Sequence, residues 1–432
     1  NAMHLCLFED ETVSHLQPLV NTRAVYDLRI GGRTLFETAT DAFAADGCVL
    51  HTRSLVAGVA AHAHPGAAEA LPSGADVLFV NGRFVAEAGP TLARLQQAVA
   101  NRASARRFLR GDTLVAAWVP DAAAVLPDDL LAADALHASA FSDLPSEPVS
   151  EAVLVGRLWH LLEQLRPALR RDFAHATTGA DRHPGIHGRD DTVVHPSVVD
   201  VNPEQIYLAP GAQVKPGAVL NAEDGPIYVG DDATIFEQAV VRGPCWVGPK
   251  SQIKAGANVE GTATGYYCKV GGEVHSSIVH SLSNKGHQGF LGDSYLGRWC
   301  NLGANTNVSN LKNDYGEVSL YDPAVDAFVG TGRQFAGLFM GDHSKCGINT
   351  MFNTGTVVGT FCNVYGGGFA PRVLPSFTWG SPEEGFVTYR LDKALEVAEA
   401  VMARRDTPLT EADRALLTTL FERTADEREQ HL

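Results

Sequence analysis

Basic residues are scarce in this chain. Its 432 residues include 34 Lys and Arg against 50 Asp and Glu, which gives a formal net charge of −16. A protein that binds nucleic acid through an overall basic surface needs an excess of cations to neutralise phosphates, so this class is excluded. Charged residues of both signs make up only 19% of the chain, whereas about 25% is usual.

Paired cysteines and long apolar runs are also missing. The seven cysteines include no C-x-x-C pair and are odd in number, so they cannot all form disulfides within the chain. This pattern favours a reducing compartment. No apolar run approaches the roughly 20 residues of a membrane-spanning helix, and no charged-then-apolar leader precedes the first domain. We therefore expect a cytoplasmic protein without a membrane segment.

Glycine, by contrast, is abundant and unevenly distributed. Of 42 glycines, 27 lie in residues 201–370, 13 before this stretch and 2 after it. The same stretch holds 14 acidic and 10 basic residues, so most of the negative charge lies elsewhere. The chain therefore changes architecture near residue 200.

The part before this change predicts an α/β domain and a linker. Residues 4–125 contain short apolar runs typical of buried strands, and 92–108 has the composition of a helix. Residues 126–200 begin with prolines, acids and serines, which indicates a linker. Leucines at helical spacing within it predict an amphipathic helix over 150–166. The apolar runs are 5–8, 77–80 and 114–119.

An apolar residue recurs every six positions from Val229 to Val259. A period of six matches neither a helix nor an alternating strand. It fits a hexapeptide β-helix, in which each short strand places one aliphatic side chain in a narrow core and each corner needs small residues. A β-sandwich would instead show alternating strands about every 8–12 residues. We expect a β-helix over 201–380, with loops leaving it near 262–290 and 309–337.

Residues 381–432 predict a helical tail. Leu391, Leu395, Ala398 and Met402 share one helical face, and the segment 410–413 has the pattern of an N-terminal cap.

The segment 285–297 and the residues after it hold the most informative motifs, which read His287-Gln-Gly-Phe290-Leu-Gly-Asp293, Asn301-Leu-Gly-Ala-Asn305-Thr306 and Ser309-Asn310. They resemble the acetyltransferase half of the bifunctional N-acetylglucosamine-1-phosphate uridyltransferase/glucosamine-1-phosphate acetyltransferase enzymes. Those enzymes carry a histidine, an aromatic residue three positions on, then Gly-Asp, and after a further turn an Asn-Ile-Gly-Ala-Gly-Thr run. The resemblance spans roughly 206–370 and implies a left-handed β-helix, a homotrimer with sites between subunits, and acetyl-CoA as acyl donor.

The resemblance also implies catalytic roles. His287 matches the general base of the family, and Asn301 and Asn310 match two active-site asparagines. Transfer of an acyl group from a thioester to an amine requires the ammonium to lose a proton, and histidine as a residue type, with a pKa of about 6.5, is suited to accept it. Asparagine amides orient the nucleophile or support the oxyanion. The structural alternatives are a corner histidine bonded to a neighbouring coil and an asparagine ladder along the β-helix.

Substrate-binding roles follow in the same way. Lys254 matches a substrate-phosphate arginine, His275 falls where the family has a phosphate-contacting lysine, and Lys312 lies near a further cationic position. Phe290 matches an active-site tyrosine but lacks its hydroxyl. Lys254, Lys269, Lys285 and Lys312 are the cations expected to gather around anionic acyl-CoA and sugar phosphate, and Lys285 is predicted to bind substrate. Solvated lysines are the alternative.

A zinc site is the competing interpretation of the histidines. His275 and His280 are five residues apart, a spacing reminiscent of the zinc ligands of β-helical carbonic anhydrases. A third histidine one or two coils upstream is lacking, so no metal site is predicted.

The N-terminal stretch 15–35 is similar to the opening of sugar-nucleotidyltransferases. Their glycine-rich loop cradles nucleotide phosphates through backbone N–H groups. Here Glu11 and Val13 stand at the glycine positions, and Val25 at that of a conserved lysine. The segment 77–83 resembles the strand that holds magnesium in those enzymes, with Arg83 in place of an aspartate. The resemblance implies a degenerate, Rossmann-like nucleotidyltransferase domain. Arg23, Arg29, Asn81 and Arg83 are candidates for weak nucleotide or phosphate contacts, and surface ion pairs are the alternative role for the three arginines.

The sequence thus favours an acyl-CoA-dependent N-acyltransferase that acts on an amino-sugar phosphate. By resemblance it belongs to the synthesis of sugar-nucleotide precursors of the cell envelope, such as UDP-N-acetylglucosamine. The alternatives are a sugar-1-phosphate nucleotidyltransferase and a sugar-nucleotide-binding protein without catalysis. Mg²⁺ is expected only if the first domain is active.

Overall fold

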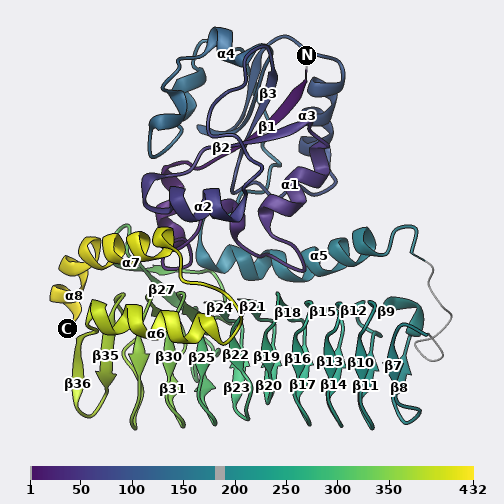
Figure 1. The fold of residues 1–432 in the computed structure, drawn as a ribbon, viewed down its shortest axis with the longest axis vertical. Helices are drawn as coiled ribbons and strands as arrows, with labels where there is room; N and C mark the ends of the chain where they lie inside the picture. Colours follow the sequence, from purple (N-terminus) through teal and green to yellow (C-terminus); the bar gives the residue numbers. More distant parts are fainter. Residues whose placement is uncertain (1, 181–189) are drawn as a thin grey trace. The chain divides into compact units, whose positions relative to one another are not determined.

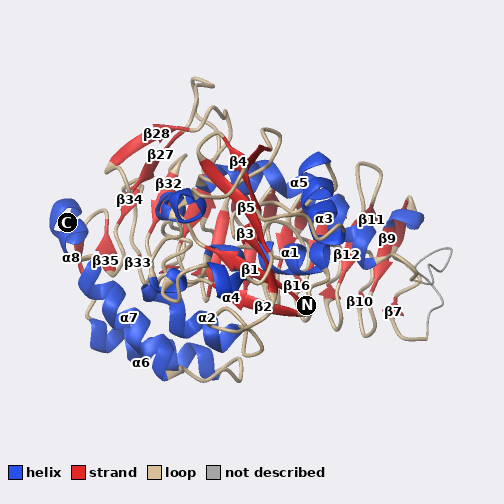
Figure 2. Cartoon of the chain, turned by 90° about the horizontal axis from the view of Figure 1, so that it is seen from above, coloured by secondary structure: helices blue, strands red, loops and turns tan. Residues whose placement is uncertain are grey.

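The computed structural model describes residues 2–180 and 190–432, and the chain forms two compact units (Figures 1 and 2). The first unit contains residues 2–16, 20–28 and 34–157, and the second contains 17–19, 29–33, 158–180 and 190–432.

The first unit is built on a six-stranded, Rossmann-like sheet with the order β2-β1-β3-β5-β4-β6. The first three strands in the chain are parallel, and β5 returns antiparallel beside β3. Their apolar side chains are buried and form the core of this unit, as the sequence predicts for residues 4–125. The strands are β1 (Met3–Phe8), β2 (Gly47–Leu50), β3 (Asp76–Asn81), β4 (Arg106–Arg110), β5 (Thr113–Val119) and β6 (Ser146–Pro148), and the helices are α1 (Leu35–Phe43), α2 (Ala57–Ala63), α3 (Pro90–Ala100) and α4 (Ala122–Val125).

The helix predicted over 92–108 is too long. Helix α3 ends at Ala100, the backbone at Arg102 turns to a φ of 44°, and β4 then begins at Arg106. Phe108 is buried against β5 in this strand. Pairing with the sheet therefore overrides a helical composition.

Residues expected to form a linker also join the sheet. β6 pairs with β4, and the backbone N–H of Val155 donates to the carbonyl oxygen of Arg83. These bonds keep the residues before 158 extended, so the amphipathic helix lies at α5 (Leu158–Ala176) rather than at 150–166. The part of the expected linker at 181–189 lies outside the described residues.

The second unit contains the predicted β-helix, whose short parallel strands stack in three faces (Figure 1). The first face consists of β7 (Val193–Val194), β10 (Gln213–Val214), β13 (Thr234–Ile235), β16 (Gln252–Ile253), β19 (Lys269–Val270), β22 (Asn284–Lys285), β25 (Asn301–Leu302), β30 (Lys345–Cys346), β33 (Asn363–Val364), β35 (Thr378–Ser381) and the antiparallel β36 (Gly385–Thr388). The second face consists of β8 (Val199–Val201), β11 (Val219–Asn221), β14 (Val240–Arg242), β17 (Asn258–Glu260), β20 (Glu273–His275) and β23 (Phe290–Gly292), followed by the pair β26 (Asn307–Val308) and β31 (Met351–Phe352). The third face consists of β9 (Ile206–Leu208), β12 (Ile227–Val229), β15 (Cys245–Val247), β18 (Ala263–Thr264), β21 (Ile278–Ser281), β24 (Tyr295–Arg298), β29 (Leu338–Met340), β32 (Thr356–Val358) and β34 (Val373–Leu374).

The six-residue ladder forms the core of this β-helix. Val229, Ile235 and Val241 lie on the third, first and second face in turn, and each is fully buried. One aliphatic side chain per face fills the narrow interior, and this explains the period of six. The fold class predicted from the sequence is confirmed.

One of the two expected interruptions is wrong. Residues 262–290 form strands β18 to β23 within the stack, although Thr264 and Lys285 replace aliphatic residues at core positions. These polar residues and shorter corners hide the repeat. The other interruption, 309–337, does leave the stack and contains a hairpin of β27 (Ser319–Asp322) and β28 (Ala327–Gly330).

The C-terminal tail is helical, as predicted. α6 (Leu391–Ala403), α7 (Glu411–Arg423) and α8 (Ala425–His431) follow the β-helix, and α6 packs beside α7 (Figure 2). The expected cap is present: the Thr410 hydroxyl accepts from the N–H of Asp413, and the Asp413 carboxylate accepts from the N–H of Thr410. In the described part of the chain, no helix is both long and apolar enough to cross a membrane.

Candidate functional site

His287 lies on an exposed corner between β22 on the first face and β23 on the second. Its backbone is fixed: the carbonyl oxygen accepts from Lys285 Nζ at 2.5 Å, and the neighbouring carbonyl of Gln288 accepts from the N–H of Asn305 at 3.0 Å. Gly289 has a φ of 123° and lies so close to the carbonyl of Thr306 that a Cβ would clash. The corner therefore presents an accessible imidazole on a rigid support.

Lys285 lies in the core of the β-helix, where it cannot bind substrate as predicted. It stands in register with the core residue Val270, and only 2% of it is exposed. Burial lowers the pKa of its ammonium to about 8. Predicted as a substrate-binding cation, Lys285 instead points into the β-helix and holds the backbone of His287 from behind.

We expect Lys285→Met to stabilise the protein at neutral pH by roughly 2 kcal/mol. Burial makes the charged lysine unfavourable, at about 1.4 kcal/mol per pKa unit, and loss of the bond to His287 offsets about 1 kcal/mol. Because the folded-state pKa of about 8 lies below the unfolded value of about 10.4, the penalty is complete below pH 8. It fades as the pH rises towards 10.

Urea denaturation of parent and variant at several pH values measures this effect. The stability gain of Lys285→Met should shrink between about pH 8 and pH 10. The control is Lys215→Met, which replaces a half-buried lysine on the same edge of the β-helix and should not reproduce the gain at pH 7. A Lys285→Met variant that is less stable than the parent at pH 7 would contradict the expectation.

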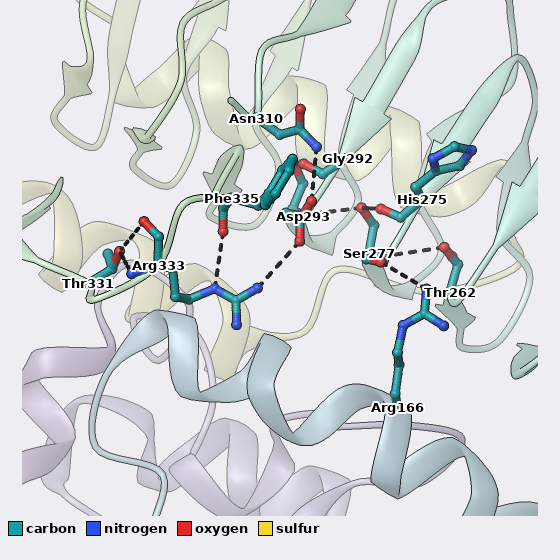
Figure 3. A network of polar contacts seen from close by, with 12 residues as sticks. Arg166, Thr262, His275, Ser277, Gly292, Asp293, Asn310, Thr331, Arg333 and Phe335 are labelled. Atoms are coloured by element: carbon teal, nitrogen blue, oxygen red, sulfur yellow. Dashed lines mark hydrogen bonds and ion pairs between the residues drawn. The ribbon is translucent and has the colours of Figure 1, made fainter. Parts of the chain in front are cut away.

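A second group of predicted residues meets where the second face turns towards the third (Figure 3). The Asn310 amide Nδ2 donates to Asp293 Oδ2 at 2.9 Å, and Arg333 Nη2 lies 3.4 Å from Asp293 Oδ1. The rings of His275 and Phe290 are in edge-to-face contact, with centroids 5.7 Å apart. The structure therefore brings His275, Phe290 and Asn310 together around one carboxylate.

Asp293 is the centre of this group. Burial raises the pKa of its carboxyl, while the bond from Asn310 and the charge of Arg333 act in the opposite direction. Its backbone carbonyl also accepts from the N–H of Gly337 at 2.8 Å, at the end of the excursion 309–337. Asp293 thus holds both ends of that excursion on the β-helix and orients the Asn310 amide, whose oxygen remains an acceptor.

The sequence-based site prediction did not include Asp293 or Arg333. Asp293 is the last residue of the motif that begins at His287, and its place in this motif was the feature of the sequence that could have identified it as a site residue. Arg333 lies 40 residues further along the chain in a stretch without a repeat, where no pattern indicates its partner.

Other predicted residues lie elsewhere on the β-helix. Asn301 projects from the first face, where its Oδ1 accepts from Asn284 Nδ2 at 3.4 Å. Lys254 lies at an earlier corner between the first and second faces, with its ammonium 4.5 Å from the centroid of the Phe236 ring. Lys312 is exposed in the excursion beside Asp314, at 3.6 Å. These three are not part of the group around Asp293.

In the first unit, carboxylates at the ends of the parallel strands are paired with arginines. Asp10 accepts from Arg83 Nε at 2.8 Å and Nη2 at 2.6 Å, and also from Asn81 Nδ2 at 2.8 Å. Glu9 pairs with Arg53 and accepts from the N–H of Val25. Asp10, Asn81 and Arg83 are buried, so the predicted phosphate contacts of Asn81 and Arg83 are internal to the protein.

The remaining predicted arginines belong to different units. Arg23 is buried in the first unit, and its carbonyl accepts from Arg53 Nη2. Arg29 belongs to the second unit, where its Nε donates to the carbonyl of His280 at 3.0 Å and its carbonyl accepts from the Tyr295 hydroxyl. Gly32 in the same segment lies so close to the Trp246 ring that any side chain would clash. Arg29 is therefore a contact of the β-helix.

The side chains of these sites are poorly arranged for binding a metal ion. Among residues 2–180 and 190–432, no group of three or more His, Cys, Asp or Glu side chains is arranged to hold a metal ion. His275 projects from the second face and His280 is buried on the third. Mg²⁺ does not fit the strand ends of the first unit, because Arg53 and Arg83 already neutralise Glu9 and Asp10.

The sequence is similar to known transferases over part of its length. Residues 5–181 match the model of the sugar nucleotidyl transferase family. The bifunctional protein GlmU of Rippkaea orientalis is 28% identical over 132 residues, which cover 28% of this chain and 27% of that protein. A bifunctional sugar-1-phosphate nucleotidylyltransferase/acetyltransferase of Sulfurisphaera tokodaii is 31% identical over 100 residues, covering 23% of this chain and 24% of that one. The chain thus matches about a quarter of the length of these relatives.

Among solved structures, the match to the UDP-N-acetylglucosamine acyltransferase of Francisella novicida covers 52% of this chain and 75% of that chain. The two chains are 11% identical over this match, with a TM-score of 0.23. Residues 5–181 thus resemble the sugar nucleotidyl transferase family, and part of the chain is similar to GlmU-type bifunctional enzymes.

Proposed function

We propose that this protein is an acyl-CoA-dependent N-acyltransferase that acts on an amino-sugar phosphate. The observation that carries the proposal is the exposed imidazole of His287, held on a fixed corner of a β-helix by Lys285 and by the following coil. Relatives that combine nucleotidylyltransferase and acetyltransferase activities support it. Cell-envelope precursor synthesis in the cytoplasm is the proposed setting.

His287 acts as the general base in this proposal. It takes a proton from the substrate ammonium, and the freed amine attacks the thioester carbonyl carbon. The C–N bond forms, the C–S bond breaks, and the coenzyme leaves as the thiolate, which takes up the second proton that the nitrogen loses on becoming an amide. Asn310, oriented by Asp293, supplies an amide oxygen for substrate.

The phosphate of the acceptor needs a cation or donor close to the base. Lys254 lies at the same kind of corner as His287, two coils earlier, whereas His275 belongs to the Asp293 group and Lys312 lies in the excursion that follows Asn310. We assign Lys254 to the phosphate on this basis, and His275, Phe290 and Lys312 to the other side of the acceptor. Because these residues lie on different sides of the β-helix, a second copy of the chain is proposed to complete the site in a homotrimer.

Release of free thiol from acetyl-CoA tests the activity. The protein is incubated with glucosamine 1-phosphate or related amino-sugar phosphates, and thiol is measured with a disulfide reagent. We expect amine-dependent release, with the corresponding N-acetyl product by mass spectrometry. Thiol release with none of these acceptors would remove the proposal.

The second candidate, a sugar-1-phosphate nucleotidyltransferase, is favoured by the family match to residues 5–181. It predicts pyrophosphate formation from a nucleoside triphosphate and a sugar 1-phosphate. The internal ion pairs of Glu9 and Asp10 oppose it, because they occupy the carboxylates that such chemistry needs for Mg²⁺. Binding of a sugar nucleotide without turnover, seen as thermal stabilisation alone, would favour the non-catalytic alternative.

A further inference from the structure

A cavity of about 430 Å³ opens on the first face of the β-helix, beside the end of α6. Its floor is formed by outward side chains of β19, β22, β25 and β30, and one wall by the last turn of α6 and the residues that follow. The lining residues used below are Lys269, Asn284, Asn301, Lys345, Arg404 and Arg405.

The charge of this cavity is entirely positive. Lys269, Lys345, Arg404 and Arg405 line it, and its lining includes no carboxylate. None of these four cations forms an ion pair with a residue in the described ranges 2–180 and 190–432. Two of them donate to neutral oxygens: Arg405 to the carbonyl of Tyr267 and to Asn284 Oδ1, and Lys345 Nζ to the carbonyl of His343. The same two cations lie over the uncharged rings of Tyr267 and Phe361.

Four cations gathered in this way repel one another. Burial lowers the pKa of Lys269, and the charges of Arg405, Lys254 and Arg404 lower it further. In a chain with 50 acidic and 34 basic residues, such a group without an acidic partner is unfavourable unless an anion fills it.

The floor of the cavity presents an ordered row of donors. Lys269 pairs in register with Asn284, Asn284 with Asn301, and Asn301 with Lys345. Neighbouring strands are about 4.8 Å apart, so the two lysine backbones lie roughly 14 Å apart with two amides between them. Such a row, faced by Arg404 and Arg405, suits an extended anion with more than one phosphate.

We propose that this cavity binds the diphosphate group of a nucleotide-type ligand. Coenzyme A and nucleoside diphosphate sugars share this group, and the cavity recognises its charge through Lys269, Lys345, Arg404 and Arg405. Asn301 takes part as an amide donor on the cavity floor. The site does not include His287, so diphosphate binding here can be measured separately from acyl transfer.

Isothermal titration calorimetry with the full chain tests the site. Inorganic pyrophosphate, coenzyme A and UDP are the three probes, each titrated without a second substrate so that turnover plays no part. We expect pyrophosphate to bind, and Lys269→Gln or Arg404→Gln to weaken it about tenfold each. Tighter binding of coenzyme A than of pyrophosphate and UDP would assign the site to the coenzyme, and tighter binding of UDP to a sugar nucleotide.

The matched control is Lys393→Gln, which removes one positive charge from an exposed residue of α6 paired with Glu396. It should leave binding unchanged. Thermal melting gives a second readout: without ligand, Lys269→Gln should melt higher than the parent because repulsion is relieved, and with pyrophosphate it should gain less. No binding of any probe at about 1 mM, or equal weakening by Lys393→Gln, would overturn the proposal.

Discussion

His287→Ala is expected to lower kcat for acyl transfer by about 10²–10⁴-fold, because a positioned base supplies this much when an ammonium must lose its proton. The KM for acetyl-CoA should change little, since the imidazole acts on the amine. Initial rates of thiol release at saturating acceptor measure the effect. The imidazole is exposed and its corner is held through backbone atoms, so the variant should fold like the parent.

The control for this prediction is His195→Ala. His195 is also exposed and follows a strand of the first face, in the first coil of the β-helix, where it contacts Ser197. Full activity in this variant and loss in His287→Ala would assign the base to one corner. An undiminished rate after His287→Ala would remove the base from the mechanism and leave the histidine with a structural role.

Arg83→Met is expected to destabilise the first unit by about 3–5 kcal/mol, because it leaves the buried Asp10 carboxylate without its cation. Replacing both partners should cost much less: in the double variant Asp10→Asn with Arg83→Met, no charge is left buried and residue 10 can still accept from Asn81. Hydrogen exchange of β1 and β3, measured by mass spectrometry, reports on this unit separately from the β-helix.

A surface pair provides the control for this effect. Arg106 lies 3.5 Å from Glu147, and both side chains are 35% exposed. Arg106→Met should therefore change stability by less than about 1 kcal/mol. If the amides of β1 and β3 are protected from hydrogen exchange equally well in Arg83→Met and in the parent, the Asp10–Arg83 pair does not stabilise these strand ends.

The stability and the function of the β-helix oppose each other at Lys285. An aliphatic residue would fit the core ladder better at this position, yet the ammonium is what binds the carbonyl of His287. Such a destabilising residue behind a proposed catalytic group is typical of functional sites, where local rules of folding are broken.

The sequence by itself determined the β-helix and the capped helical tail. Val229, Ile235 and Val241 repeat at a period that only a three-faced coil satisfies, and Thr410 with Asp413 forms a cap within four residues of the chain. Both are local patterns, in which each residue's surroundings follow from its near neighbours. The position of His287 on a corner was predictable for the same reason.

Only the tertiary structure decided which distant residues meet. Asp10 and Arg83 are 73 residues apart in the chain. Lys269 on β19 and Arg404 in the turn after α6 reach one cavity although they are far from each other in sequence. The inward direction of Lys285 depends on strand register, since a shift of one residue reverses the side of every side chain. Register and helix packing arise from contacts across the whole unit, and no local pattern in the sequence carries them.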